Sequence, residues 1–250
     1  MTQDLFRTDA YLQECQATVT AITDQGIVLD RTVFYPLGGG QAGDSGELVL
    51  ASGEAQGSTL TIIDTRKGKN AEGQFTDEIC HWPNPDQHVT LSKLKPGDTV
   101  TARIDWARRH RLMRFHTTTH LLCHIVPQLV NGCSITPDYA RLDFNMTEAL
   151  DKEALTAGIA QLVAAAHPVT VGSITDEELD ANPALVKSMS VQPPRGSGRI
   201  RTIRIGEARH IDFQPCGGTH VANTAEIGTV VVTKIEKKSA TTRRVVLGFA

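Results

Sequence analysis

The fold changes character at WARRHRLMRFHTTTHLLCHIVPQLV, residues 106–130 of the chain. Apolar side chains recur there at helical spacing, at Leu112, Phe115, Leu122, Ile125, Val126 and Leu129. Pro127 lacks the N–H that a helix interior requires, so we expect the helix to end or bend near Ile125. The stretch therefore predicts one long helix, and the patterns on its two sides differ.

The part of the chain before this helix is rich in strand-like patterns. Alternating or β-branched runs occur at 17–22, 26–35, 60–65, 88–92 and 99–104. Turn-forming sequences separate them, and the proline-containing stretch 80–86 is expected to be a loop. Many short strands at this spacing are typical of a small barrel or sandwich. We predict a β-barrel-like domain over residues 1–106.

After the long helix, helical and strand patterns alternate. A second helix is predicted over 148–166 with Thr147 as its N-cap, and Thr175 with Glu178 forms the capping-box pattern of a short third helix. The stretch 193–198 is expected to be an exposed loop, and strands are predicted at 200–205, 209–213, 228–236 and 243–249. Helices packed on one antiparallel sheet would form an α+β domain over residues 107–250.

Composition narrows the class of protein. The 250 residues are 40% hydrophobic and 21% charged, as in ordinary globular proteins. No apolar run approaches the roughly 20 residues of a membrane span, and the acidic N-terminus lacks the apolar core of an export signal. The five cysteines are odd in number and scattered, so we expect no disulfide framework and a cytoplasmic location.

Charge is distributed unevenly along the chain. The net charge is −3, but residues 1–105 carry 8 basic and 15 acidic side chains, whereas residues 106–250 carry 17 and 13. A basic second part fits a polyanionic partner such as nucleic acid, and it also fits a mildly uneven surface.

Two short motifs can supply metal ligands. His116 and His120 lie four residues apart on the long helix, so both imidazoles face the same side. The pair resembles half of a zinc protease site, but Thr117 stands where such a protease has its glutamate base. A protease interpretation therefore lacks its catalytic base.

The second motif is Cys216-Gly-Gly-Thr-His220. Its two glycines, preceded by Pro215, favour a tight loop that folds both end residues around an ion. Together the motifs offer three imidazoles and one thiolate, a set that zinc favours in tetrahedral geometry. We predict one zinc ion bound by His116, His120, Cys216 and His220, with the neighbouring His124 outside the ligand set.

The two motifs in this order resemble the signature of the editing domain of alanyl-tRNA synthetase and of the free-standing, AlaX-type alanyl-tRNA editing proteins. FYPLGGGQAGDSG at 34–46 is similar to the glycine-rich loop of that family, and RRHRLMR at 108–114 is similar to the stretch that leads into its metal helix. RLDF at 141–144 and the basic residues near 234–244 also follow the family's order. Gly38 stands where the loop commonly has serine, which leaves the discrimination between amino acids open.

The resemblance implies a medium-sized editing protein without an aminoacylation domain, with the β domain followed by the editing domain. Its expected activity is hydrolysis of the ester between tRNA(Ala) and a wrong amino acid, chiefly serine and then glycine. A hydrophobic pocket rejects an added hydroxyl poorly, so a second, hydrolytic site is useful. The zinc ion would polarise the ester, activate water or position the substrate.

Further residues are assigned by position in these motifs. Gln41 and Thr117 are candidate catalytic residues, the former to orient water or substrate and the latter to recognise the serine hydroxyl. The candidates for substrate binding are Gly39, Gly40, Thr136 and Asp212, of which Asp212 is also suited to hold a metal-bound histidine. The candidate phosphate contacts for tRNA are Arg108, Arg109, Arg111, Lys237, Lys238, Arg243 and Arg244.

Two other functions compete with this hypothesis. One is an RNA-binding module in which the zinc ion is purely structural, which would bind tRNA and leave Ser-tRNA(Ala) intact. The other is the zinc peptidase that Thr117 already disfavours.

Overall fold

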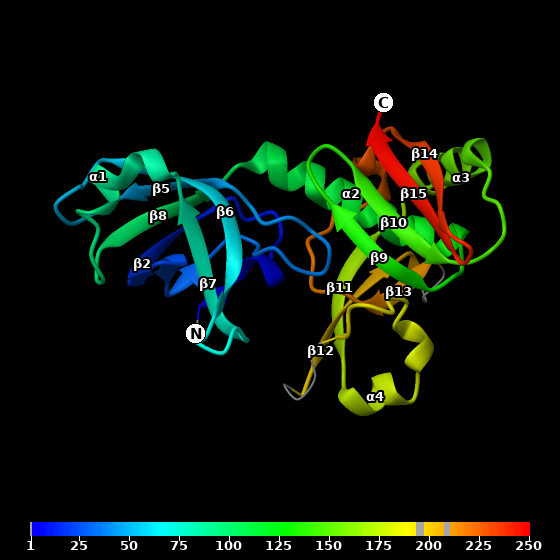
Figure 1. The fold of residues 1–250 in the computed structure, drawn as a ribbon, viewed down its shortest axis with the longest axis horizontal. Coiled ribbons are helices and arrows are strands. Elements are labelled where there is room, and N and C mark those ends of the chain that lie inside the picture. The colour runs from blue at the N-terminus through cyan, green and yellow to red at the C-terminus, as the bar shows by residue number, and fades with distance from the viewer. Residues whose placement is uncertain (1, 194–197, 208–210) are drawn as a thin grey trace. The chain divides into compact units, whose positions relative to one another are not determined.

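The computed structural model describes residues 2–193, 198–207 and 211–250. It confirms an α+β chain (Figure 1). The chain forms two compact units: Met1–Gly38 with Ala42–His110, and Gly39–Gln41 with Arg111–Ala250. Residues 194–197 of the predicted loop and 209–210 of a predicted strand lie outside the described residues.

The first unit is built from antiparallel strands. Its main strands are β2 (Glu14–Thr23), β3 (Gly26–Leu29), β5 (Gly46–Leu50), β6 (Thr59–Lys69), β7 (Phe75–Pro83) and β8 (Thr99–Ile104). They pair in the closed order β2-β3-β7-β6-β5-β8, a barrel in which every strand has two neighbours. The short strands β1 (Gln3–Asp4) and β4 (Arg31–Thr32) pair in parallel beside it.

Alternating side chains fill the barrel. Along β6, Leu60 and Ile62 are buried whereas Thr61 and Ile63 are exposed, as expected where successive side chains point to opposite faces. Leu60 and Ile62 share one core cluster with Val19, Leu48 and Val100, which come from three other strands.

Two predictions in this unit were wrong, the predicted strand 26–35 is broken into β3 and β4, and one strand was not predicted. Residues 88–92 were expected as a strand, but His88–Leu91 form helix α1 after the 3₁₀ turn Pro85–Gln87, which Asn84 caps through Asp86 N. The stretch 80–86 is not all loop, because β7 continues to Pro83. Strand β5 was missed altogether.

The second unit contains the long helix and two sheets. Helix α2 (Trp106–Ile125) ends two residues before Pro127, which confirms the prediction, and its residues from Arg111 onward belong to this unit. The larger sheet has the order β14-β15-β10-β9, with β9 (Val130–Ile135), β10 (Ala140–Asn145), β14 (Val230–Ser239) and β15 (Thr242–Phe249). The smaller has the order β11-β12-β13, with β11 (Val169–Ile174), β12 (Ile200–Ile205) and β13 (Asp212–Pro215).

The single sheet predicted for this part of the chain is therefore wrong, because β11 to β13 pair separately from the others. Helix α3 (Lys152–Ala164) packs on β14 and begins later than predicted, since Asp151 rather than Thr147 caps it by accepting a hydrogen bond from Ala154 N. The capping box of Thr175 and Glu178 is confirmed at the start of helix α4 (Asp176–Asp180). Short 3₁₀ turns lie at Leu5–Arg7, Pro183–Leu185 and Thr224–Ile227.

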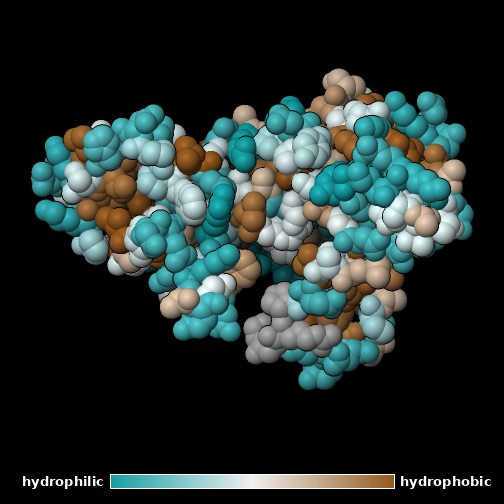
Figure 2. Space-filling view, in the orientation of Figure 1, coloured by the Kyte–Doolittle hydropathy of each residue, from teal (hydrophilic) through white to brown (hydrophobic). Residues whose placement is uncertain are grey.

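Hydrophilic side chains cover most of the visible face of each unit (Figure 2). Across the described ranges, no helix combines the length and the apolar character needed to cross a membrane.

Candidate metal centre

Helix α2 and the loop after β13 bring the two sequence motifs together. His116 and His120 lie one helical turn apart with ring centroids separated by 5.4 Å, and both are buried. Pro215 ends β13, and the loop that follows carries Cys216 and His220. One candidate ligand atom from each of these four residues lies within 4.8 Å of the other three. The group can hold one metal ion, as the sequence predicted.

The nitrogen that faces the centre is Nε2. The Sγ atom of Cys216 lies 3.4 Å from Nε2 of His116 and 3.3 Å from Nε2 of His220. The backbone N–H of Gly218 also points at this sulfur, at 3.4 Å. The thiol sulfur and the two imidazole nitrogens, all borderline or soft donors to metals, therefore lie next to one another.

Each histidine is anchored from behind through its other nitrogen. Nδ1 of His116 lies 2.7 Å from Oε1 of Gln41, and Nδ1 of His120 lies 2.7 Å from Oδ2 of Asp212. Nδ1 of His220 lies 3.2 Å from the hydroxyl of Thr117. With the proton on Nδ1, all three rings donate outward and turn Nε2 inward, the tautomer that a metal site needs.

Asp212 is the charged member of this outer set. It is 2% exposed, and its other carboxylate oxygen pairs with Nζ of Lys187. Burial works against ionisation, but the hydrogen bonds and charges of His120 and Lys187 outweigh it and lower the pKa of Asp212 to about 2. Burial likewise disfavours the charged imidazole, yet Asp212 and Cys216 raise the pKa of His120 to about 9.

The thiol of Cys216 is biased toward the thiolate. Burial alone would raise its pKa, but the neighbouring His116 and His220 hold the pKa well below its usual value. A thiolate is the form that binds metals. Burial and the nearby His116 hold the pKa of His220 well below its usual value, so this ring stays neutral and able to donate its lone pair.

Glycine is required where the loop passes the helix. A Cβ on Gly218 would overlap the ring of His116 and come within 2.9 Å of Oε1 of Gln41. Gly39 and Gly40 have positive φ, and a Cβ on Gly40 would meet the carbonyl of Cys133 at 2.9 Å. These glycines allow Gln41 to reach the metal group.

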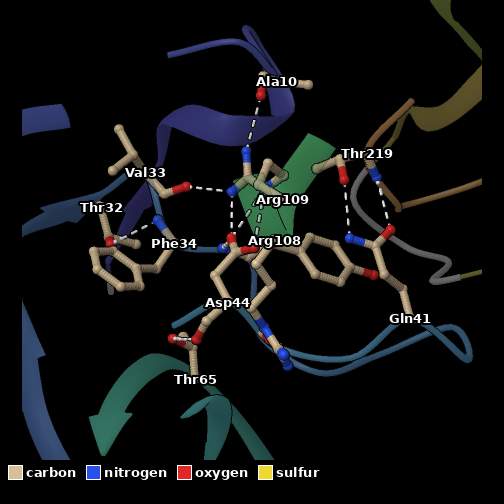
Figure 3. Close-up of polar contacts among 12 residues, drawn as sticks. Ala10, Thr32, Val33, Phe34, Gln41, Asp44, Thr65, Arg108, Arg109 and Thr219 are labelled. Atoms are coloured by element: carbon tan, nitrogen blue, oxygen red, sulfur yellow. Dashed lines mark hydrogen bonds and ion pairs between the residues drawn. The ribbon is translucent and has the colours of Figure 1, made fainter. Parts of the chain in front are cut away.

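Gln41 and Thr117 lie behind the candidate ligands. Oε1 of Gln41 accepts from His116. It also accepts from the backbone N–H of Thr219 at 3.1 Å, and Nε2 of Gln41 donates to the hydroxyl of Thr219 at 2.9 Å (Figure 3). The Thr117 hydroxyl accepts from Val221 N at 3.2 Å in addition to its contact with His220. Both side chains are fully buried.

The remaining predicted substrate residue is engaged locally. The hydroxyl of Thr136 donates to the carbonyl of Tyr139 at 2.9 Å and accepts from the N–H groups of Asp138 and Tyr139. It therefore stabilises the turn between β9 and β10.

Two of the predicted phosphate contacts are wrong. Arg109 is fully buried and paired with Asp44, and it also donates to Val33 O and Ala10 O, so its guanidinium is out of reach of a phosphate (Figure 3). Arg243 is 8% exposed and donates to a ring of backbone carbonyls that includes those of Glu148 and Ser239.

The other basic candidates stay partly or fully accessible. Lys237 and Lys238 are exposed on β14. Arg244 pairs with Asp143, Arg111 donates to Pro137 O, and Arg108 donates to Gly43 O. All three of these arginines are partly exposed.

Thr219 and Lys187 were not predicted from the motifs. Thr219 lies inside the Cys-Gly-Gly-Thr-His motif, so its position was a usable signal. Lys187 lies 25 residues from its partner Asp212, with no pattern linking them.

Comparisons with known proteins give the class and then the family. A family model described as tRNA synthetases class II (A) matches residues 7–108, and the Threonyl and Alanyl tRNA synthetase second additional domain matches residues 200–246. Each model covers less than half of the chain, so these matches show similarity to parts of class II synthetases. The chain is 34% identical over 98% of its length to the alanyl-tRNA editing protein AlaX-M of Methanosarcina barkeri, covering 97% of that protein. It belongs to this family of alanyl-tRNA editing proteins.

Two further relatives show which part of each protein the chain matches. The AlaX-M protein of Saccharolobus solfataricus is 33% identical, with 98% of each chain covered. An alanine–tRNA ligase of Metallosphaera sedula is 33% identical over 94% of this chain, but over only 25% of the ligase. The chain thus matches whole editing proteins and one segment of a much longer synthetase.

Proposed function

We propose that this chain is a zinc-dependent hydrolase that removes a wrong amino acid from tRNA(Ala), chiefly serine and secondarily glycine. The observation that carries the proposal is the convergence of three anchored imidazoles and one thiolate on one point. The relatives named alanyl-tRNA editing proteins supply the substrate class.

Zinc fits this donor set better than the alternatives. Three imidazole nitrogens with one thiolate suit a borderline-soft ion of tetrahedral preference, whereas calcium and magnesium require oxygen ligands. When bound, zinc would polarise the ester carbonyl, lower the pKa of a water molecule or orient the acylated end of the tRNA.

The chain's own residues act by holding the ligands. Gln41 fixes the ring of His116 and, through Thr219, the loop that carries Cys216. We therefore assign Gln41 and Thr117 to positioning rather than to direct contact with water. We assign the positive-φ backbone of Gly39 and Gly40 to contact with the acylated end of the tRNA, and Asp212 directs Nε2 of His120 at the centre.

Docking of tRNA is assigned to exposed cations. Lys237 and Lys238 are the strongest candidates, because neither side chain is buried. The partly exposed Arg108, Arg111 and Arg244 would add charge near the phosphates. In this proposal residues 1–106 form a supporting β domain, residues 107–250 form the editing domain, and the reaction takes place in the cytoplasm, where tRNA is charged.

One assay tests the proposal. Purified protein is incubated with Ser-, Gly- and Ala-tRNA(Ala), with and without a zinc chelator, and release of the amino acid is measured. We expect rapid loss of serine, slower loss of glycine, little loss of alanine, and abolition of hydrolysis by chelation that added zinc restores. Tight binding of Ser-tRNA(Ala) without hydrolysis would instead support the RNA-binding module with a structural zinc ion.

A further inference from the structure

The loop that carries Cys216 and His220 is held by an arginine on the neighbouring strand. Arg201 lies on β12, next to β13, in the register where Thr202 pairs with Pro215. Its Nη1 donates to the carbonyl of Cys216 at 2.6 Å and to the carbonyl of Gly218 at 3.0 Å. Its own carbonyl accepts from the N–H of Cys216 at 3.2 Å. Arg201 therefore holds Cys216 by both the N–H and the C=O groups.

The N–H groups of the same loop point the other way. The N–H of Gly218 faces Sγ of Cys216, and the N–H of Thr219 donates to Oε1 of Gln41. The peptide between Gly218 and Thr219 thus has its carbonyl on Arg201 and its N–H on Gln41. Because a peptide is planar, contacts at both ends fix its orientation. The loop is held between Arg201 on one side and the ligand cluster on the other.

This grip matters because two of the loop residues are glycines. Glycine loses more backbone freedom on ordering than any other residue, so Gly217 and Gly218 do not by themselves define where Sγ and Nε2 point. The two carbonyls also converge on one side, where their negative ends repel each other. A single NH₂ group of a guanidinium offers one hydrogen to each carbonyl and carries a compensating positive charge.

We propose that Arg201 is a positioning residue for the metal site: it sets the backbone of the Cys216–His220 loop so that Sγ and Nε2 meet the two histidines of α2. It acts through the backbone carbonyls of Cys216 and Gly218. The inference rests on the proposed zinc site and adds to it a residue outside both metal motifs.

Metal affinity is the direct readout. Zn²⁺ dissociation constants are measured by competition with a chromophoric chelator, and Co²⁺ loading is followed by its thiolate charge-transfer and ligand-field absorption. For Arg201→Ala we expect a dissociation constant raised by about 10- to 100-fold, the usual cost of removing a group that orients metal ligands, and a weakened thiolate band. Arg201→Lys keeps the charge without the planar pair of donors, and we expect an intermediate constant.

Arg204→Ala is the matched control. Arg204 lies on the same strand, three residues further along, with its guanidinium 4.9 Å from the ring centroid of Phe213. We expect native metal affinity from this variant. Native affinity and a native Co²⁺ spectrum in Arg201→Ala would overturn the inference, as would equal weakening in the control.

Two further outcomes separate this inference from the function on which it rests. Stoichiometric metal binding by the unsubstituted protein, with no loss in Arg201→Ala, removes the inference alone. An unsubstituted protein that binds neither Zn²⁺ nor Co²⁺ removes the metal-dependent function as well. Should Arg201→Ala fail to fold by circular dichroism, Arg201→Lys decides: a raised dissociation constant supports the inference and a native one overturns it.

Discussion

Two buried polar clusters, one in each unit, are built on opposite plans. In the first unit the guanidinium of Arg109 meets Asp44, Val33 O at 2.7 Å and Ala10 O at 2.9 Å, while Asp44 also accepts from Tyr35 N at 2.6 Å (Figure 3). Donors and acceptors match one another within the cluster. In the second unit the outer nitrogens of the histidines are matched in the same way, but three imidazole nitrogens and a thiolate sulfur are turned toward a common point.

The difference distinguishes buried polar groups that stabilise the fold from buried polar groups that can bind a ligand. A buried pair whose hydrogen bonds are complete costs much to break and offers nothing to a ligand. In the second cluster each histidine Nδ1 has a hydrogen-bond partner in the protein, whereas the Nε2 atoms and the sulfur face one another. Such an arrangement is suited to binding a ligand such as a metal ion. Burial and charge alone do not tell the two apart, whereas the direction of the hydrogen bonds does.

The largest expected effect comes from removing the sulfur. Cys216→Ala should lose bound zinc and lower deacylation of Ser-tRNA(Ala) by at least about 100-fold, because a ligand is lost and not merely tilted. Metal content by elemental analysis and single-turnover hydrolysis give the measurement. Cys133→Ala is the control, since burial raises the pKa of the Cys133 thiol to about 12 and keeps it protonated. A metal-loaded, active Cys216→Ala protein would remove the metal site.

Breaking the buried pair of Arg109 and Asp44 in the first unit should lower the stability of the fold rather than the metal affinity. Arg109→Met leaves the carboxylate of Asp44 buried without its cation, and we expect the free energy of unfolding of the first unit to fall by about 3–5 kcal/mol. Urea denaturation measures this loss, and the folded fraction should retain its zinc. Arg103→Ala, which removes an exposed arginine paired with Glu14 and Glu47, should change stability far less. Equal losses in both variants would contradict the distinction.

A second buried polar group in the first unit, centred on His81, predicts that the folded state is less stable at acidic pH. His81 is fully buried between Thr32 and the carbonyl of Ile27, and burial lowers its pKa from 6.5 to about 4. The unfolded chain therefore takes up a proton near pH 6.5 that the folded chain resists until about pH 4. Stability is complete above pH 6.5 and falls, by up to about 3 kcal/mol, as the pH drops through this window.

Denaturant titrations of wild type and His81→Gln between pH 7 and pH 4 isolate this effect. The neutral amide cannot take up the proton, so the variant should lose this component of the pH dependence. Parallel curves for the two proteins would show that His81 is not the group responsible.

A smaller effect is expected behind the metal ligands. Asp212→Asn keeps a hydrogen-bond acceptor for His120 but removes the charge, and we expect the zinc dissociation constant to rise by about tenfold. Asp143→Asn removes a carboxylate that pairs with Arg244 on the larger sheet, and it should leave zinc affinity unchanged. Competition with a chelator measures both constants, and unchanged affinity in Asp212→Asn would deny the carboxylate a part in holding His120.

The smallest effect is expected from exposed lysines that lie in neither of the two buried clusters. Replacing Lys237 and Lys238 by alanine should lower kcat/KM for Ser-tRNA(Ala) a few-fold at low salt. The slope of log rate against log salt should also become shallower, by about one for each phosphate that the variant no longer neutralises. Lys152→Ala, exposed at the start of α3, is the control. A rate at subsaturating tRNA that does not change with salt would exclude electrostatic docking.

Local patterns carried the successful predictions. Helix α2 is long and followed by Pro127, and the pairing of Thr175 with Glu178 needs only three residues of spacing. The prediction that His116, His120, Cys216 and His220 form one group came from two motifs with residues four apart, and on helix α2 this spacing places both histidines on one face. Short apolar runs are ambiguous, which is why His88–Leu91 was assigned to a strand.

Contacts between residues far apart in the chain could not be predicted from the sequence. The smaller sheet joins Val169 to Ile205, and no local signal links such distant strands. Arg109 was predicted to contact phosphate as one of a basic cluster, whereas its partner Asp44 lies 65 residues earlier. The same holds for Arg201, whose acceptors are backbone carbonyls with no side-chain signature.

Residues Gly39–Gln41 belong to the second compact unit although the barrel strands surround them in sequence. A fragment cut before residue 107 would retain the four metal ligands and lack the acceptor that orients His116. The halves on either side of such a cut cannot be exchanged between relatives independently, because the loop and the histidine it serves must match.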